Sequence, residues 1–308
     1  MNARQNTGRS TDHRNSIRLE ESVVLSQEDC AGDQFILRLQ APRTAAEARP
    51  GSFIHLQCHD MLPMRRPLSI MRANPEAGWI ELLYRVFGTG TRHLSRHGVG
   101  TRLSLLGPIG RPFVLHPERP RPLLIGGGVG IPPMIFLCAE IQQSVRAWNP
   151  LLLMGSETPF PFAPRPSQII IPGLPPDLIA AMPLMEDWQI PSRLASGRPL
   201  PGCHMGHVTE LAHHWLASMD RQQRAEVEIF ACGPHPMLAA AASLAAEYAL
   251  PCQVSLEEFM ACGVGGCAGC AVRVQTPDGP VMQRVCVDGP VFDATAVFPE
   301  CGPTATCL

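Results

Sequence analysis

The stretch Ala261-Cys-Gly-Val-Gly-Gly-Cys-Ala-Gly-Cys270 places three cysteines within nine residues, and a fourth, Cys286, follows after fifteen intervening residues. The C-x4-C-x2-C spacing is that of plant-type [2Fe–2S] ligation. The glycines allow positive φ angles and let backbone N–H groups approach the sulfur atoms of a cluster. We therefore expect Cys262, Cys267, Cys270 and Cys286 to hold a [2Fe–2S] cluster, so that the chain would carry single electrons.

Two simpler interpretations of these cysteines are a zinc site and a disulfide pair. Zinc sites usually combine two separated C-x2-C or Cys/His pairs, whereas only one C-x2-C occurs here. The spacing therefore favours the iron–sulfur cluster over zinc.

The residues after this loop have the pattern of a β-hairpin. We expect strands at Ala271–Gln275 and Val281–Val287, joined by a turn at Pro277-Asp-Gly279. Such a hairpin would return Cys286 to the loop that carries the other three cysteines. We assign residues 252–308 to this cluster module.

The composition of the chain limits its class. Its 308 residues suffice for two compact domains and a small third one. The formal net charge of −2 implies no basic face for nucleic acid or acidic lipid. The chain has no run of 18 apolar residues and its N-terminus is polar, so we expect neither a membrane span nor a signal peptide. Cysteines outside the loop are scattered, as is typical of reduced thiols, and we expect a cytoplasmic protein.

The region upstream alternates in the manner of an antiparallel barrel. Residues 1–15 are polar and aperiodic, and we expect a disordered tail there. Residues 16–118 contain six short strand-like segments and one helical piece near Thr91–His97, which predicts a six-stranded barrel. The six segments are Ser22–Ser26, Gln34–Gln40, Ser52–Cys58, Leu68–Arg72, Trp79–Val86 and Thr101–Leu105.

Residues 119–251 change to an alternation of strands and helices, which predicts a parallel α/β sheet. The Pro-rich stretch 159–201 interrupts it, and we expect a loop-rich insertion with one helix near Asp177–Met182. Strands are expected at Pro122–Ile125, Leu151–Met154, Gln168–Ile171 and Val227–Ala231, and the other helices at residues 131–148, Thr209–Met219 and Pro234–Ala249.

Two segments of the predicted barrel suit a phosphate-bearing cofactor. Arg66-Pro-Leu-Ser69 offers a guanidinium fork for phosphate oxygens and a hydroxyl for a flavin ring. Leu83-Tyr-Arg85 and Gly88-Thr-Gly-Thr91 lead into the one helix, whose N-terminus would also favour phosphate. For the first segment alone a surface arginine beside a strand turn is the favoured interpretation, and the second segment alone is weak evidence. The two together, upstream of a dinucleotide-like domain, carry the prediction.

Two further segments would lie at the edge of the predicted sheet. Gly126-Gly-Gly-Val-Gly130 joins a strand to a helix but lacks the G-x-G-x-x-G pattern, so a plain glycine-rich turn is the alternative. Cys232-Gly-Pro234 follows another strand, where a buried structural cysteine is the alternative. Glu157 lies shortly after the strand Leu151–Met154, with no Arg or Lys nearby. A 2′-phosphate would prefer a basic residue there, so this segment favours NAD(H) over NADP(H).

The order RPLS, YRVFGTGT, GGGVGIPP and CGP resembles the ferredoxin–NADP reductase superfamily over roughly residues 17–292. The cysteine loop and Cys286-Val-Asp-Gly-Pro290 look specifically like those of the electron-transfer subunits of class 1B dihydroorotate dehydrogenases. The Pro-rich segment 159–201 departs from that family.

The resemblance implies FAD, [2Fe–2S] and NAD(H) as cofactors, and an FMN-containing dihydroorotate dehydrogenase catalytic subunit as partner in a heterotetramer. Electrons from dihydroorotate would pass through the cluster and FAD to NAD⁺, in pyrimidine biosynthesis. Ser69 and Cys232 would act at the hydride step. The implied FAD residues are Arg66, Pro67, Leu68, Ser69, Leu83, Tyr84, Arg85, Gly90 and Thr91, and the implied nucleotide residues are Gly126, Gly127, Gly128 and Gly130.

Two other functions remain open from the sequence. Related subunits serve sulfhydrogenases and ferredoxin–NAD(P) transhydrogenases, in which other iron–sulfur proteins deliver the electrons. A zinc-binding interaction module on a barrel scaffold, with no redox function, is the third possibility. Flavin absorption near 450 nm, characteristic of the bound cofactor, would exclude it.

Overall fold

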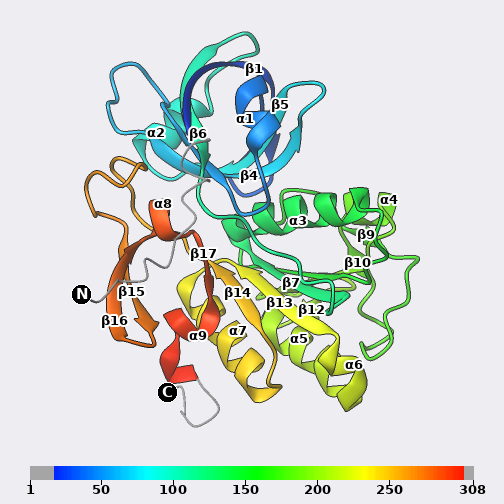
Figure 1. Cartoon of the computed structure of the whole chain (residues 1–308). Coiled ribbons are helices and arrows are strands. Elements are labelled where there is room, and N and C mark those ends of the chain that lie inside the picture. The colour runs from blue at the N-terminus through cyan, green and yellow to red at the C-terminus, as the bar shows by residue number, and fades with distance from the viewer. Residues whose placement is uncertain (1–16, 302–308) are drawn as a thin grey trace, which may run out of the picture.

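The structure is a computed structural model that describes residues 17–301. Figure 1 shows the barrel above a helix-covered sheet, with the C-terminal module beside both. The expected tail at residues 1–15 lies outside the described residues. No helix within residues 17–301 is long and apolar enough to cross a membrane.

The predicted six-stranded antiparallel barrel is confirmed, and it closes in the order β1-β2-β5-β4-β3-β6. Two short helices, α1 (Pro42–Glu47) and α2 (Thr89–Leu94), lie in its connections. The strands are β1 (Arg18–Cys30), β2 (Gln34–Gln40), β3 (Phe53–Leu56), β4 (Arg66–Asn74), β5 (Trp79–Arg85) and β6 (Arg102–Ile109).

Strand β3 is buried on both faces, which matters for the site below. Successive side chains of a strand point to opposite faces. Ile54 and Leu56 accordingly join the barrel core, whereas Phe53 joins the core that contains Cys270 and Cys286. The outer face of β3 is therefore covered by the rest of the molecule.

The predicted α/β domain is built on a seven-stranded sheet of order β12-β11-β8-β7-β13-β14-β17. All neighbouring pairs are parallel except β14 with β17. The strands are β7 (Arg121–Gly127), β8 (Leu151–Ser156), β11 (Ser192–Ser196), β12 (His204–Met205), β13 (Val227–Cys232), β14 (Cys252–Ser255) and β17 (Val291–Asp293). The helices are α3 (Ile131–Gln143), α4 (Pro183–Asp187), α5 (Val208–Ala217), α6 (Arg221–Ala225) and α7 (His235–Glu247).

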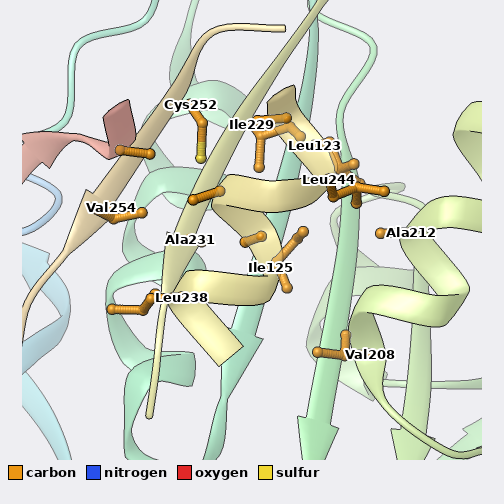
Figure 2. Close-up of a cluster of buried hydrophobic side chains, with 14 of the residues drawn as sticks. Leu123, Ile125, Val208, Ala212, Ile229, Ala231, Leu238, Leu244, Cys252 and Val254 are labelled. Carbon is orange, nitrogen blue, oxygen red and sulfur yellow. The ribbon is translucent and has the colours of Figure 1, made fainter. Parts of the chain in front are cut away.

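One face of this sheet is closed by α5 and α7. Figure 2 shows Ile125 and Ile229 of the sheet among Val208 and Ala212 of α5 and Leu238 of α7. These side chains belong to one buried cluster, which extends to Cys270 and Cys286. The packing of the sheet and the cysteine module is thus continuous.

The Pro-rich insertion differs from the prediction. The expected strand Gln168–Ile171 is a bend, because Ser167 Oγ and Gln168 N both donate to the buried carboxylate of Glu186. The expected helix Asp177–Met182 is a turn that runs into the two-residue strand β10 (Ala180–Ala181), which pairs with β9 (Arg165–Pro166). The sheet strand of this region is β11, for which no strand was predicted.

The C-terminal module forms the predicted hairpin from β15 (Ala271–Thr276) and β16 (Gly279–Arg284). The second strand ends earlier than expected, and Cys286 lies on the short helix α8 (Val285–Asp288). Helix α9 (Ala294–Val297) follows β17. Among the described cysteines Cys301 is disulfide-bonded, contrary to the expectation of reduced thiols, and the others are free.

Candidate flavin, nucleotide and iron–sulfur sites

The first part of the site is the contact between β4 and α2. The side chain of Arg66 lies against Gly90, where a Cβ would come within 2.8 Å of Arg66 Nε. Arg66 Nη1 also donates to the carbonyl oxygen of Met64 at 2.8 Å. The guanidinium and the first turn of α2 therefore converge, which brings two kinds of N–H donor to one place for a phosphate.

The turn before α2 has a defined shape. Gly88 precedes the helix with a φ of 86°, a left-handed conformation that favours glycine. The backbone N–H of Phe87 donates to Thr91 Oγ1 at 2.7 Å. The Thr91 hydroxyl is thereby engaged within the turn, and its expected contact with FAD stays a prediction.

The remaining flavin candidates occupy β4 and β5 in different ways. Pro67, Leu68 and Ser69 are half-buried on β4, next to β3. The three candidates on β5 have different surroundings. Leu83 is buried against the α/β core, and Arg85 is exposed at the end of the strand. The Tyr84 hydroxyl donates to Gln27 Oε1 at 3.0 Å inside the barrel. Tyr84 thus offers its main chain, not its ring, to a ligand.

The nucleotide candidates lie where β7 enters α3. A Cβ at Gly130 would overlap the main-chain carbonyl of Cys232, and one at Gly127 would come within 2.5 Å of Met237 Sδ. A Cβ at Gly126 would come within 3.1 Å of Ile131 Cα. Packing against a main-chain carbonyl thus requires glycine at position 130, while Gly126 and Gly127 sit in tight surroundings. Gly128 differs, since it has a φ of 54° and open space beside it.

Cys232 ends β13 at this same edge, in register with Gly126 on β7 and Ser255 on β14. Its side chain is 1% exposed, and burial raises the pKa of the thiol well above its usual range. In this state Cys232 is a neutral, covered thiol. Its role at the hydride step stays a prediction.

The four cysteines, three on the loop and Cys286 on α8, lie together as two pairs. Cys270 and Cys286 are buried with their sulfur atoms 3.4 Å apart. Cys262 interacts with Cys267, and the Gly266 N–H donates to Cys262 Sγ at 3.2 Å. Burial raises the pKa of Cys262, but hydrogen bonds from its neighbours outweigh that effect and lower it to about 7. The surroundings of Cys262 thus favour the thiolate that a metal requires, whereas burial and the neighbouring Cys270 raise the pKa of Cys286 to about 12.

Close packing explains the glycines of this loop. Gly265 has a φ of 83°, and a Cβ there would come within 2.5 Å of Val287 Cγ2. The carbonyl of Gly265 accepts a hydrogen bond from Arg284 Nη1 at 2.7 Å. The loop is therefore fastened to the hairpin and to α8, which bring Cys286 to it.

The arrangement of the four thiols as two pairs suits a two-iron cluster. A four-cysteine zinc site needs all four ligands at one ion, whereas a [2Fe–2S] cluster spreads four cysteines over two irons. Two pairs of thiols fit the cluster.

His55 is a site residue that the sequence analysis missed. It lies on the outer face of β3 and is 0% exposed, and neither ring nitrogen makes a hydrogen bond of normal geometry, although the main chain of Met260 and Cys262 lies close to the ring. A Cβ at Gly263 would come within 2.9 Å of His55 Nδ1. Burial, with Arg65 nearby, lowers the pKa of His55 to about 4, so the ring is neutral. The only sequence signal is a histidine at an alternating position of Phe53-Ile-His-Leu56.

Comparison with known proteins shows which family combines this fold with this cysteine loop. Residues 257–298 match the family model for the iron-sulfur cluster binding domain of dihydroorotate dehydrogenase B. The electron transfer subunit of dihydroorotate dehydrogenase B (NAD(+)) from Desulforamulus reducens is 30% identical over 292 residues, which cover 91% of this chain and 98% of that protein. The subunit from Caldanaerobacter subterraneus is 32% identical and is matched over 87% of its length. The chain belongs to this family.

Solved structures agree with this membership of the dihydroorotate dehydrogenase B electron transfer subunits. The structure of an NADH-dependent reduced ferredoxin-NADP oxidoreductase, described for flavin-based electron bifurcation, is similar with a TM-score of 0.70 and 25% identity, over 90% of this chain and 89% of that one. The ferredoxin reductase of carbazole 1,9a-dioxygenase shares the fold, with a TM-score of 0.58, 22% identity and coverage of 76% of this chain and 67% of that one.

As a member of this family, the chain is an oxidoreductase subunit whose fold provides for FAD, a [2Fe–2S] cluster and NAD(H). The residues present fit each group. Arg66 lies against Gly90, and a side chain at position 90 would crowd the guanidinium that we expect to hold a phosphate. Two cysteine pairs suit two irons, and Gly128 leaves room for a nucleotide at the end of β7. The expected phosphate, cluster and nucleotide positions are thus compatible with the geometry.

Proposed function

We propose that this chain accepts electrons from an FMN-containing dihydroorotate dehydrogenase catalytic subunit and delivers them to NAD⁺. The observation that carries the proposal is the contact between the cysteine loop and the flavin barrel. Gly263 of the loop packs on His55 of β3, and His55 pairs across the sheet with Pro67 of the Arg66–Ser69 segment. The two cofactor sites are thus one strand apart, as electron transfer between them needs.

When bound, the flavin exchanges a hydride with a nicotinamide and single electrons with an iron–sulfur cluster. The chain's own residues position these groups. Arg66 and the first turn of α2 would hold the flavin phosphates, Ser69 would contact the flavin ring, and Gly128 would admit the nucleotide. Cys262, Cys267, Cys270 and Cys286 would hold the cluster. No acid–base pair is needed, because the task of the protein would be to position the carriers and tune their potentials.

The surface around the loop suits a partner that delivers electrons. Cys267 is exposed, and Phe259 just before the loop is 92% exposed. Val264 within the loop is also exposed. Apolar side chains and a cluster ligand at one surface favour a protein partner that covers them. We place the catalytic subunit here, in a heterotetramer.

The test is co-expression with the dihydroorotate dehydrogenase catalytic subunit from the same organism. We expect the two chains to co-purify, with flavin absorption near 450 nm and a broad iron–sulfur shoulder, and to reduce NAD⁺ in the presence of dihydroorotate. A complex that binds both cofactors but reduces NAD⁺ only with reduced ferredoxin would contradict the choice of donor. A colourless, zinc-loaded chain would contradict the redox function itself.

The structural likeness to the NADH-dependent reduced ferredoxin-NADP oxidoreductase supports a second candidate. In that reading the chain would receive electrons from another iron–sulfur protein, as in a ferredoxin–NAD(P) transhydrogenase or a sulfhydrogenase. The matches across almost the whole length of the dihydroorotate dehydrogenase B subunits favour the first donor. Parallel assays with dihydroorotate and with reduced ferredoxin separate the two.

We infer a cytoplasmic location, which the free thiols of most described cysteines support. We propose domain boundaries of 16–118 for the flavin barrel, 119–251 for the nucleotide domain and 252–308 for the cluster module. Strands β14 and β17 of the last segment complete the central sheet, so the cluster module is anchored to the nucleotide domain.

A further inference from the structure

His55 is a buried polar side chain without a partner. Both ring nitrogens lack a hydrogen bond, and the side chain is fully enclosed. Within the described residues, the only other buried side-chain nitrogen or oxygen atom without a hydrogen bond is Arg193 Nε. Arg193 still donates two hydrogen bonds through its other nitrogens. Among these described residues His55 alone lacks a hydrogen bond of normal geometry at both ring nitrogens, and the main-chain groups close to its ring are those of Met260 and Cys262.

The direction of the ring points to the cysteine loop. Ile54 and Leu56, its neighbours on β3, face the barrel core, so His55 faces outward. The main-chain groups of Met260 and Cys262 lie within reach of the ring, and Gly263 packs on it. Gly263 has a φ of 68°, so the loop adopts a glycine conformation where it meets the imidazole.

The backbone of His55 is fixed from the other side. Arg65 Nη1 donates to the His55 carbonyl at 3.3 Å and to the Ser104 carbonyl at 2.6 Å, and Arg65 Nη2 donates to Ser104 Oγ at 2.8 Å. This arginine fastens β3 to β6 beside the start of β4. The main chain that carries the imidazole is therefore fastened within the barrel.

We propose that His55 is a positioning residue that links the cluster loop to the flavin barrel and fixes the cluster relative to the flavin. An imidazole carries at least one N–H donor, and the ring of His55 lies against Gly263 and close to the main chain of Met260 and Cys262. Outer hydrogen bonds of this kind orient metal ligands and tune the metal. This inference rests on the proposed presence of both cofactors, but on no particular electron donor.

An ordinary core histidine is the competing explanation. A histidine that served packing alone could be replaced by phenylalanine, which is apolar and of similar shape, with little effect on the cluster. A positioning histidine could not, because the N–H donor would be lost. Glutamine, which restores an N–H donor, would then recover the property that phenylalanine removes.

The experiment uses the purified full chain with both cofactors and compares His55→Phe, His55→Gln and Ile54→Val. Ile54 is adjacent on β3 but faces the barrel core, so Ile54→Val controls for a general loss of packing. The measurements are iron content, the electron paramagnetic resonance spectrum of the reduced cluster, the rate of cluster loss to a chelator, and the rates at which NADH reduces the flavin and then the cluster.

We expect His55→Phe to alter the resonance spectrum and to speed cluster loss by about 10- to 100-fold. Flavin reduction by NADH should be unchanged while cluster reduction slows. His55→Gln should recover part of each property, and Ile54→Val should resemble the parent. A His55→Phe protein with the parent's spectrum, cluster lifetime and cluster reduction rate would overturn the proposal.

If His55→Phe cannot retain a cluster, His55→Gln decides: a retained cluster with recovered lifetime supports the proposal, and equal loss in both variants overturns it. The assay needs only NADH and this chain. Failure of the dihydroorotate assay would therefore remove the proposed donor and leave the result on His55 standing.

Discussion

The guanidinium of Arg66 lies directly against Gly90, so that a methyl group at position 90 would come within 2.8 Å of Arg66 Nε. The two residues are 24 positions apart in the sequence and come from β4 and α2. An arginine held against a helix N-terminus combines charge with backbone N–H donors, and both favour a phosphate. The absence of a side chain at Gly90 thus determines where the Arg66 guanidinium can lie.

This relationship predicts that Gly90→Ala weakens FAD binding without unfolding the barrel, because the flexible Arg66 side chain can move aside. We expect the Kd for FAD to rise by about 10- to 100-fold, as for the loss of hydrogen bonds to a charged group. Arg66→Ala should have an effect at least as large. Flavin content and fluorescence titration of the apoprotein measure both.

Gly98→Ala is the matched control for Gly90→Ala, since a Cβ at Gly98 meets no atom within 4 Å. It should bind FAD like the parent. Full FAD content in Arg66→Ala would show that the phosphate site has been misplaced.

The cysteine pairs predict that one replacement in either pair abolishes the cluster. Cys286→Ser and Cys262→Ser should each lose most of the iron and the absorbance above 450 nm, because a four-cysteine site no longer has all its ligands. Cys30→Ser, at a half-buried free thiol in the barrel, is the control. Iron and sulfide analysis checks the result, and a fully loaded Cys286→Ser protein would rule out the fourth ligand.

Two adjacent glycines of the loop should respond differently to alanine. An alanine at position 265 would crowd Val287 and would have to adopt a φ of 83°. A Cβ at Gly266 has only Cys262 Sγ near it, at 3.9 Å. We expect Gly265→Ala to destabilise the loop by about 1–2 kcal/mol, the cost of a left-handed residue with a side chain. Faster cluster loss to a chelator in Gly265→Ala than in Gly266→Ala tests this, and equal rates would contradict it.

Much of the fold and of the site follows from the sequence where a single property decides it. The cysteine spacing and the short alternating strands needed only local information, and the barrel and cluster module followed. Strand β11 did not, because Ser192-Arg-Leu-Ala-Ser196 is polar in composition and is buried only through its neighbours β8 and β12. The bend at Gln168 depends on Glu186, eighteen residues away. His55 was missed for the same reason, since its neighbours come from a distant loop.

Glu81 gives the barrel a pH dependence of known sign. Its carboxylate is 3% exposed and accepts hydrogen bonds from Arg38 and Arg72. Burial raises its pKa, but the two arginines outweigh burial and lower it below the usual value. The folded state therefore gains stability above the unfolded-state pKa of Glu, near 4.3, and loses it as the pH falls through the lower folded-state pKa.

We expect Glu81→Gln to reduce the free energy of unfolding at neutral pH by about 1–3 kcal/mol, because two arginines lose a charged acceptor. The difference from the parent should shrink as the pH falls below 4. Urea unfolding at several pH values measures it. Glu226→Gln removes a more exposed pair with Arg121 and should cost less than about 1 kcal/mol. A constant difference at all pH values would contradict the assignment to Glu81.

The glycine turn after β7 should separate stability from nucleotide binding. Gly130→Ala would overlap the main-chain carbonyl of Cys232, which cannot swing aside as a side chain can, so we expect a loss of about 1–3 kcal/mol in stability. Gly128→Asn meets open space, and asparagine tolerates its φ of 54°. Its side chain would occupy the room left for the nucleotide. We expect a raised KM for NADH with a Tm close to that of the parent, and an unchanged KM would place the nucleotide elsewhere on the sheet edge.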